Sequence, residues 1–353
     1  MTNLSDKSLP KDWDCKCRRA PFFSIIIPMY NAERYIHECL NSVLNQSFRA
    51  VELIVIDDGS SDHSVSNCLA IMDQGHEFVL LGQRQSGPNT ARNLALRHVN
   101  GEYVLFMDAD DRLSLNSLEI LYEEICKYPD SDVTSFGYTF FDDETGYTRT
   151  SACPSRRHLI GDDIFIEALT GRDFGGVCWN KCFRYSFLLQ NRIAFIPDKI
   201  HGRDLIFSRS AAFHAKEWRS FDAVIYESRF SSGSFSRNFG ERNIRSAIDV
   251  ANKHIEVFLD GATRRGSLPQ LYYAIYRHLR YILLLSAFRS PSYSEYKRYF
   301  QIVQESTVWS QIERNTAGVC DRITEKVMST LLKFPRLCWV FARILKRLNY
   351  KPY

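Results

Sequence analysis

Continuous apolar runs, each followed by a polar cluster, mark the first half of the chain. Phe22–Pro28, Leu53–Ile56 and Tyr103–Met107 are short and rich in β-branched or aromatic residues, as expected of strands buried on both faces. Runs at Phe78–Leu81 and Val133–Phe136 predict two further strands. Strands that alternate with helical segments over short connections predict an α/β fold with a mainly parallel sheet covered on both faces.

The helical segments of this half have apolar residues at helical spacing. Asn31 is the expected N-cap of a helix whose apolar face consists of Ile36, Cys39, Leu40, Val43 and Leu44. A second helix opens at the chain-breaking stretch Ser86–Asn89, and a third runs from about Ser114 to Lys127. These helices would cover the predicted sheet.

The pattern changes at about residue 240, beyond which it indicates helices with interleaved tyrosines and arginines. We expect these helices at 247–259, 271–287, 293–304 and 327–348. The chain is therefore predicted to have three parts: a mobile polar tail (1–20), an α/β domain (21–238) and a basic helical C-terminal region (239–353).

Composition and charge support this division. With 353 residues and 45% hydrophobic residues, the chain is typical of globular proteins of one large or two ordinary domains, not of disordered chains. The net charge of +4 is too small to indicate a nucleic-acid partner. It is unevenly distributed: residues 264–353 have 16 Lys and Arg against 5 Asp and Glu, and the rest of the chain has 29 against 36.

The ten cysteines are irregularly spaced, and the absence of paired C-x-x-C motifs argues against structural zinc. Cys15 with Cys17, and Cys178 with Cys182, stay open as metal or redox pairs. Met1–Ala20 has no apolar signal-peptide core, and no run of about 18 apolar residues occurs. We therefore expect a cytoplasmic protein.

Two acidic clusters directly follow predicted strands: Asp57–Asp62 and Asp108–Asp111. Ligands of parallel α/β sheets bind beyond the carboxyl ends of the strands, although turns and helix N-caps favour the same residues. If the strand end is extended, Asp108 and Asp110 point to one side. Their oxygens suit Mg²⁺ or Mn²⁺ with open positions for a diphosphate, whose charge the ion would neutralise as a nucleotide leaves.

A nucleoside pocket is predicted beside that ion. A carboxylate of Asp57 or Asp58 could accept hydrogen bonds from a base N–H or a ribose hydroxyl. Tyr30, which follows Pro28 at the end of the first strand, could offer its ring for base stacking.

Five motifs occur in a specific order along the α/β half. They are Ser24–Asn31 (SIIIPMYN), Asn41–Ser47 (NSVLNQS), Val55–Asp62 (VIDDGSSD), Gly87–Asn93 (GPNTARN) and Gly101–Asp111 (GEYVLFMDADD). In this order and spacing the chain resembles the family 2 glycosyltransferases over about residues 22–235. That family has the GT-A fold and transfers sugars from nucleotide diphosphates with inversion. The resemblance implies a GT-A catalytic domain at 21–238.

The resemblance also assigns roles in nucleotide binding. Pro28, Tyr30 and Asp58 would contact the base, and Asp57 would lie close to the nucleoside. Arg92 would either approach the diphosphate or donor sugar, or tie Asp108 by an ion pair.

Metal binding falls by resemblance to Asp108 and Asp110, the D-x-D pair, with Asp110 as the direct ligand. The cofactor would be Mn²⁺ or Mg²⁺. Asp111 would be a partner of these ligands or a helix N-cap, and we favour the N-cap.

The catalytic base implied by the resemblance is Asp204, which precedes an apolar helical pattern. The alternatives are that Asp204 only caps that helix and that Asp198 contributes. Arg203 stands where the family commonly has Glu. An adjacent cation would lower the pKa of the Asp204 carboxyl, which would keep it ionised but make it a weaker base.

Two loops complete the predicted site. Trp179 resembles a residue on the acceptor side and could stack on a sugar, but it could equally be a buried structural side chain. The stretches Tyr226–Arg229 and Ser231–Arg237 resemble a loop that closes over the donor diphosphate, with Arg229 and Arg237 as phosphate contacts. An ordinary solvent loop is the alternative.

The C-terminal stretch 331–348 mixes aromatic and aliphatic residues with Lys and Arg. This composition suits a helix at an anionic membrane surface; a helical cap on the catalytic domain is the alternative, and RNA binding is a poorer one.

The function expected from the whole sequence is metal-dependent inverting glycosyl transfer, of hexosyl or N-acetylhexosaminyl type. A UDP-sugar is the expected donor, and a glycan or lipid-linked hydroxyl in cell-surface polysaccharide synthesis is the expected acceptor. The enzyme would be cytoplasmic or peripheral on the inner face of the membrane. A nucleotidyltransferase and an inactive nucleotide-sugar or glycan-binding module are the alternatives.

Overall fold

The structure, a computed structural model, describes most of the chain in seven stretches: 20–142, 148–151, 157–171, 176–197, 204–229, 240–315 and 333–347. The predicted N-terminal tail, except for residue 20, lies outside them. The chain divides into two compact units. The sheet unit comprises 1–158, 178–198 and 216–229, and the helical unit comprises 159–177, 199–215 and 230–353.

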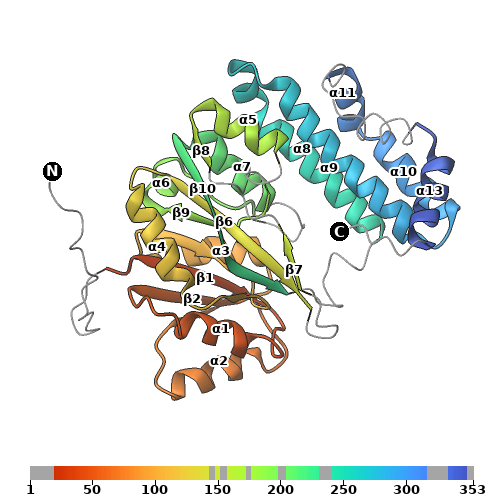
Figure 1. Cartoon of the computed structure of the whole chain (residues 1–353). Helices are drawn as coiled ribbons and strands as arrows, with labels where there is room; N and C mark the ends of the chain where they lie inside the picture. Colours follow the sequence, from red (N-terminus) through yellow and green to blue (C-terminus); the bar gives the residue numbers. More distant parts are fainter. Residues whose placement is uncertain are drawn as a thin grey trace. The chain divides into compact units, whose positions relative to one another are not determined.

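Ten described strands form one mixed, mostly parallel sheet (Figure 1). Its main path runs β3-β2-β1-β4-β9-β6-β10-β5, with β7 paired to β6 and β8 paired to β10. The strands are β1 (Phe23–Met29), β2 (Val51–Asp57), β3 (Val79–Gly82), β4 (Tyr103–Phe106), β5 (Arg112–Leu113), β6 (Val133–Phe141), β7 (Thr148–Ser151), β8 (Arg157–Ile160), β9 (Lys181–Arg184) and β10 (Glu217–Arg229).

Strand β1 is the centre of the parallel part of the sheet. It pairs in parallel with β2 on one side and β4 on the other, and β2 pairs in parallel with β3. All seven residues of β1 are buried, as its unbroken apolar pattern predicts. At the edge of the sheet, β3 leaves Val79 39% exposed, although its apolar run is as continuous as those of the buried strands.

The described part of the sheet unit contains five helices, and the sequence predicted the first, third and fourth of them. They are α1 (Ile36–Leu44), α2 (Ser64–Asp73), α3 (Pro88–Leu96), α4 (Ser117–Lys127) and α6 (Tyr185–Gln190). The expected N-cap of α1 is wrong. The N–H groups of Tyr35 and Ile36 both donate to the Ala32 carbonyl, so a turn separates Asn31 from the helix. The Asn31 side chain instead accepts the Ser61 N–H at 2.9 Å.

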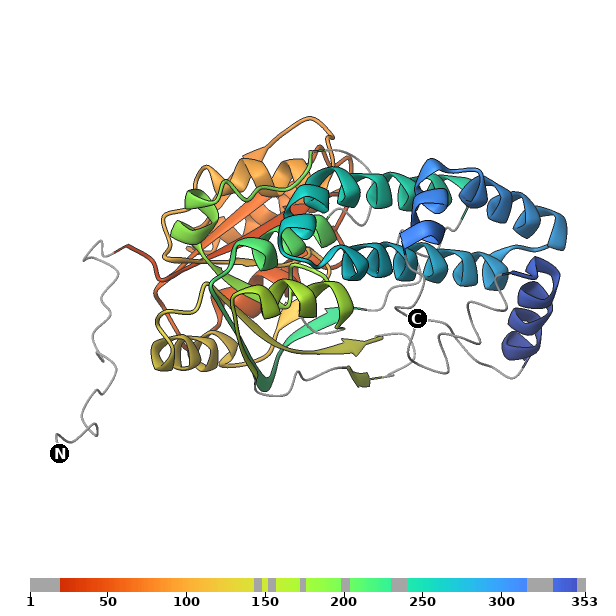
Figure 2. The same ribbon diagram turned by 90° about the horizontal axis from the view of Figure 1, so that it is seen from above.

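The helical unit contains α5 (Asp162–Thr170), α7 (Asp204–His214), α8 (Glu241–Arg264), α9 (Leu268–Arg289), α10 (Tyr293–Gln304), α11 (Thr307–Asn315) and α13 (Pro335–Arg347). Helices α8 and α9 pack side by side, as the view from above shows (Figure 2). Helices α5 and α7 pack on each other, and α5 also packs on α9. The domain boundary expected near residue 239 stays a prediction.

The C-terminal helices confirm the helical pattern beyond residue 240, with longer bounds than expected for α8 and α9. The predicted helix at 327–348 is described from Pro335 to Arg347. Among the described residues, none of the helices combines the length and apolar character needed to cross a bilayer.

Candidate functional site

The carboxyl ends of β2, β1 and β4 lie next to one another and bring the predicted site together. Met29 is paired with Asp57, and the Asp58 N–H donates to the Met29 carbonyl at 2.8 Å. On the other side of β1, the Met107 N–H donates to the Ile26 carbonyl at 3.0 Å. The backbone thus places both acidic clusters at one edge of the sheet, where ligands of such sheets bind.

Residues 108–111 form a hydrogen-bonded turn, which we call the acidic turn. The Asp111 N–H donates to the Asp108 carbonyl at 3.1 Å, so the condition of an extended strand end is not met. Strand β4 ends at Phe106, and after Met107 the chain turns to enter β5, which pairs with β10. The relative orientation of the Asp108 and Asp110 carboxylates is therefore set by this turn and not by the alternation of side chains along a strand.

Arg92 holds one carboxylate of the acidic turn. Its Nη2 lies 2.7 Å from Oδ1 of Asp108, so of the two roles considered for Arg92 the ion pair is present. The Arg92 side chain is 7% exposed, whereas that of Asp108 is 38% exposed. Nη1 of Arg92 also donates to Oδ1 of Asn89 at 3.1 Å. The Arg92 guanidinium is therefore held on the buried side of Asp108. The Asp108 carboxylate stays accessible to a ligand.

The acidic turn carries a surplus of negative charge. Burial, and then the charge of Asp108, raise the pKa of Asp110 to about 6. Burial raises the pKa of Asp111 well above its ordinary value, and Asp110 and Asp108 raise it further. A divalent cation would relieve this repulsion, so these residues fit a hard cation with oxygen ligands.

The protein side chains alone would leave some coordination positions of such an ion unfilled. Within the described stretches, no three His, Cys, Asp or Glu side chains are grouped to hold a metal. Asp108 and Asp110 would supply two carboxylates, and water and a phosphate-bearing ligand would fill the remaining positions.

Asp111 faces the protein, and Tyr226 of β10 holds it. The Tyr226 hydroxyl donates to Oδ2 of Asp111 at 2.6 Å, and the Arg229 N–H donates to Oδ1 at 2.6 Å. The residue at the N-cap of α4 is Asn116, so the N-cap role favoured for Asp111 is wrong. Asp111 instead joins the acidic turn to β10.

The stretch Tyr226–Arg229 is the end of strand β10, not a loop, because it pairs with β6. The Arg229 side chain is 3% exposed, ion-paired with Glu38, and its Nε donates to the Asp110 carbonyl at 2.7 Å. Its role as a phosphate contact stays a prediction, as does that of Arg237, which lies outside the described residues.

Asp58 fixes the loop that leads into α3. It is 4% exposed, and its Oδ1 accepts hydrogen bonds from Nε2 of Gln83 and the Ser86 N–H, both at 2.7 Å. Its Oδ2 accepts the Gly87 N–H at 2.8 Å. Gly87 has a φ of 95°, which favours glycine, and it starts the helix that carries Arg92.

The other nucleoside residues lie at the ends of β1 and β2. Oδ1 of Asp57 accepts the Ser60 N–H at 3.1 Å. Pro28 is buried within β1, whereas Tyr30 is 46% exposed. Tyr30 follows Met29, which pairs with Asp57, and its exposed ring suits the expected stacking role, while the base contacts stay predictions.

Trp179 packs inside the sheet unit. It is 8% exposed and stacks on Tyr226 with ring centroids 4.8 Å apart and planes inclined by 17°. The edge-to-face contact with Tyr138 has a centroid distance of 4.6 Å. These contacts favour the structural alternative, because the ring supports the residue that holds Asp111.

Asp204 is the first residue of α7 and belongs to the helical unit. Its role as the base stays a prediction. Arg203 and Asp198, the residues weighed with it, lie outside the described residues.

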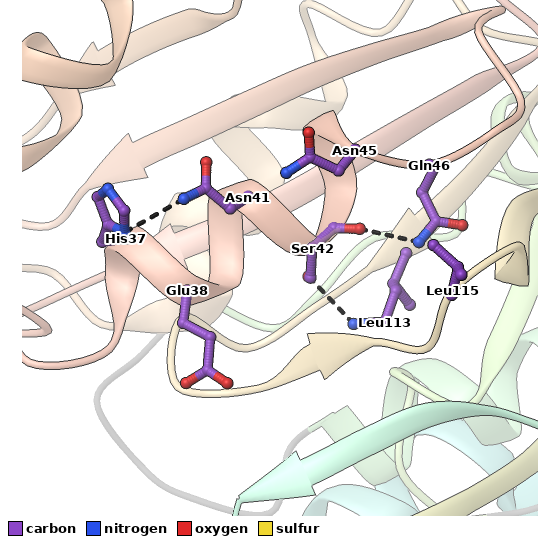
Figure 3. A pocket seen from close by; sticks show the side chains of 8 residues that line it. All are labelled: His37, Glu38, Asn41, Ser42, Asn45, Gln46, Leu113 and Leu115. Carbon is purple, nitrogen blue, oxygen red and sulfur yellow. Dashed lines mark hydrogen bonds between the residues drawn. The ribbon is translucent and has the colours of Figure 1, made fainter.

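A shallow groove of about 430 Å³ runs along α1 (Figure 3). It is lined by His37, Glu38, Asn41, Ser42, Asn45, Gln46, Leu113 and Leu115. Gln46 and Ser42 are engaged with the backbone: Nε2 of Gln46 donates to the Ser114 carbonyl at 2.9 Å, and Oγ of Ser42 accepts the Leu113 N–H at 3.1 Å. These bonds give the NSVLNQS motif a structural role, because they join α1 to the segment that follows the acidic turn.

A largely parallel sheet with acidic residues beyond β2 and β4 is typical of α/β proteins that bind a ligand at the carboxyl ends of their strands. The model of the family "Glycosyl transferase family 2" matches residues 24–188, and this stretch of the chain belongs to that family. The predicted family is thereby confirmed.

Two curated relatives are bacterial. The chain is 24% identical over 305 residues to "Glycosyltransferase GlyA" of Streptococcus pneumoniae, covering 82% of this chain and 42% of the relative. It is 40% identical over 275 residues to "Minor teichoic acid biosynthesis protein GgaA" of Bacillus subtilis, covering 74% of this chain and 59% of the relative. The chain thus spans about two fifths to two thirds of the length of the curated relatives it matches.

Solved structures share the fold. Staphylococcus aureus TarS 1–349 in complex with UDP-GlcNAc has a TM-score of 0.53 at 22% identity, covering 83% of this chain and 92% of that chain. Mannosyltransferase PcManGT from Pyrobaculum calidifontis, in complex with GDP-Man and Mn²⁺, has a TM-score of 0.51 at 16% identity, covering 95% of this chain and 89% of that chain. The chain has the predicted GT-A-like α/β fold followed by a helical region.

Proposed function

We propose that the chain transfers a sugar from a nucleoside diphosphate, UDP in the first place, to a hydroxyl of a glycan or lipid-linked acceptor. Membership of family 2 supports the reaction class. The likeness to a teichoic acid biosynthesis protein supports a role in cell-surface polymer synthesis. The UDP-GlcNAc bound to TarS supports UDP as the nucleotide.

The observation that carries the proposal is the acidic turn at the end of β4. The Asp108 carboxylate is accessible and is ion-paired on its buried side with Arg92. Burial and the charge of Asp108 raise the pKa of Asp110 to about 6. Accessible carboxylates beside surplus negative charge suit a cation that carries a diphosphate. A site that only capped a helix would need neither feature.

The residues of the sheet edge would bind and orient the nucleoside. The exposed Tyr30 ring would stack on the base, and Asp57 would accept hydrogen bonds from the nucleoside. Asp58 would act mainly through the loop that it holds in front of α3, because three donors already occupy its carboxylate.

Asp110 and Asp108 would hold Mn²⁺ or Mg²⁺. The Mn²⁺ in PcManGT supports a metal in this fold. When bound, the ion supplies charge neutralisation on the diphosphate that leaves. Tyr226 and Arg229 would keep the turn in place through Asp111 and the Asp110 carbonyl.

Asp204 would act as the general base of an inverting displacement. The acceptor oxygen would form a bond to C1 of the sugar as the bond from C1 to the diphosphate oxygen breaks. The leaving nucleotide keeps that electron pair, and the Asp204 carboxylate takes the hydroxyl proton. The neighbouring Arg203 would keep Asp204 ionised at neutral pH.

The test is a screen of nucleotide sugars with Mn²⁺ or Mg²⁺, in which released nucleoside diphosphate is measured with and without acceptor glycans. Release of a nucleoside diphosphate is expected. Release of pyrophosphate would instead identify a nucleotidyltransferase. Donor binding by calorimetry without any product would identify a binding module.

Peripheral placement on the inner face of the cell membrane is also part of the proposal. It is supported by the basic C-terminal region and by the surface of α13 described below.

A further inference from the structure

Helix α13 exposes apolar residues on one side. Leu337, Val340 and Ile344 are 56%, 43% and 51% exposed and lie at spacings of three and four residues, which puts them on one helical face. Phe334, directly before the helix, is 55% exposed. We call these four residues the apolar stripe. A helix face that met only water would be polar.

The other side of α13 anchors it to the helical unit. Cys338 and Ala342 are buried, and α13 packs against α9 and α10. Arg343 donates to the Ser290 carbonyl, and Trp339 lies edge-to-face against Tyr293 with centroids 6.0 Å apart. Because these contacts hold the helix, the apolar stripe is not the face that α13 packs against the described helices α9 and α10.

The apolar stripe is concentrated compared with the remaining surface. Four of the thirteen large apolar residues that are exposed in the described stretches fall between residues 334 and 344. The others are spread from Tyr30 to Tyr281. Single exposed apolar side chains are normal, whereas a cluster on one helix face marks an interaction surface.

The positive charge around the apolar stripe indicates which kind of partner can bind it. Residues 333–347 contain five Lys and Arg and no Asp or Glu. Lys333 and Arg336 are exposed beside the apolar stripe. A second copy of the chain would bring cations against cations, whereas an anionic lipid surface offers an apolar interior and negative headgroups together.

We propose that α13 docks on an anionic lipid surface, with the apolar stripe entering the acyl boundary. Lys333 and Arg336 would lie at headgroup level, where their long stems cover apolar surface and their charges meet lipid phosphates. The docking is interfacial, in accord with the lack of a bilayer-crossing helix among the described residues. It is independent of the proposed sugar transfer, since no residue of the acidic turn takes part.

The test is cosedimentation of the full chain with phosphatidylcholine vesicles, with and without phosphatidylglycerol. We expect binding to the anionic vesicles and weakening by salt, because exposed charge pairs are screened. The double variant Leu337→Ser/Ile344→Ser should lose about tenfold in lipid affinity. Leu189→Ser, which alters a single 58% exposed apolar residue of α6, is the matched control and should bind as the unchanged chain does.

A second variant pair tests the charge. Lys333→Gln/Arg336→Gln should weaken binding to anionic vesicles and leave the weak binding to neutral vesicles unchanged. Equal binding by the double serine variant and the control would overturn the proposal, as would equal affinity of the unchanged chain for both vesicles. A dimer in solution that the serine variant abolishes would also overturn it, since a second copy would then occupy the stripe. Circular dichroism of each variant checks that the chain keeps its helix content.

Discussion

The hydroxyl of Tyr226 lies 2.6 Å from Oδ2 of Asp111 and donates a hydrogen bond to it. The hydroxyl oxygen of Tyr226 also accepts a hydrogen bond from the Asp108 N–H at 3.1 Å. One side chain of β10 therefore binds both ends of the acidic turn. Trp179 stacks on its ring and limits how far the tyrosine can move.

Replacing Tyr226 with phenylalanine should loosen the acidic turn without creating a cavity in the core, because the ring is kept. The buried Asp111 carboxylate and the Asp108 N–H would each lose a partner, and leaving a buried group unsatisfied costs about 1–3 kcal/mol. We expect the apparent affinity for Mn²⁺ in sugar transfer to fall about tenfold, which corresponds to about 1.4 kcal/mol. Turnover measured against Mn²⁺ concentration checks this.

Tyr185→Phe is the matched control for this substitution. It removes another tyrosine hydrogen bond of the sheet unit, the one of 2.7 Å to the Leu96 carbonyl. If both variants shift the metal titration equally, Tyr226 has no specific positioning role.

Asp110→Asn should remove a negative charge from the acidic turn at nearly constant volume. Loss of an electrostatic partner in a catalytic site typically lowers turnover by about a hundredfold or more. We expect a loss of this size, together with weaker metal-dependent donor binding in calorimetry. Asp130→Asn, at an exposed position, should change neither. Normal turnover of the unchanged chain in the presence of a chelator would contradict the metal role.

Strands β1, β2 and β4 were predictable because burial on both faces leaves a nearly continuous apolar run. The location of the acidic clusters followed, because the carboxyl ends of neighbouring parallel strands meet at one edge. By contrast, Asn31 and Asp111 show the weakness of local reasoning. Both have the composition of N-caps, yet each bonds to a distant segment instead.

The contacts of Tyr226 and Arg229 could not be predicted. They join positions 115 and 119 residues apart, and they depend on the pairing of β10 with β5 and β6. No periodicity within either segment encodes that pairing. The resemblance to the family drew attention to this stretch, but it indicated a loop where the structure has a strand.

Asp204→Asn should abolish transfer while sparing donor binding. General-base catalysis contributes about 10²–10⁴-fold, so a loss in that range is expected in turnover with acceptor. If Asp204 only capped α7, the variant would lose about 0.3–1 kcal/mol of stability and would keep nearly normal turnover, because that is the typical effect of an acidic residue in a first turn. Asp163→Asn in the first turn of α5 is the matched control for this cost. A nearly normal rate for Asp204→Asn would move the base elsewhere.

His254 of α8 should make the stability of the helical unit depend on pH. Its Nδ1 lies 2.7 Å from the Val250 carbonyl, which can only accept, and its Nε2 lies 2.8 Å from Nη1 of Arg209, which can only donate. The imidazole is therefore held neutral, with the proton on Nδ1. Burial and then the charge of Arg209 lower the pKa of His254 well below 6.5, and the same causes lower the pKa of His278 in α9 to about 4.

The sign of this pH dependence follows from the lowered pKa values. As the pH falls below about 6.5, both imidazoles take up a proton in the unfolded chain but stay neutral in the folded one. The contribution of these two histidines to the free energy of unfolding should therefore be constant above pH 7 and fall toward pH 4. Urea unfolding at pH 7.5 and pH 5 measures the difference. His254→Gln, whose side-chain oxygen can still accept from Arg209, should reduce that difference without abolishing it, because His278 remains. An unchanged difference would show that His254 titrates alike in the folded and unfolded chains.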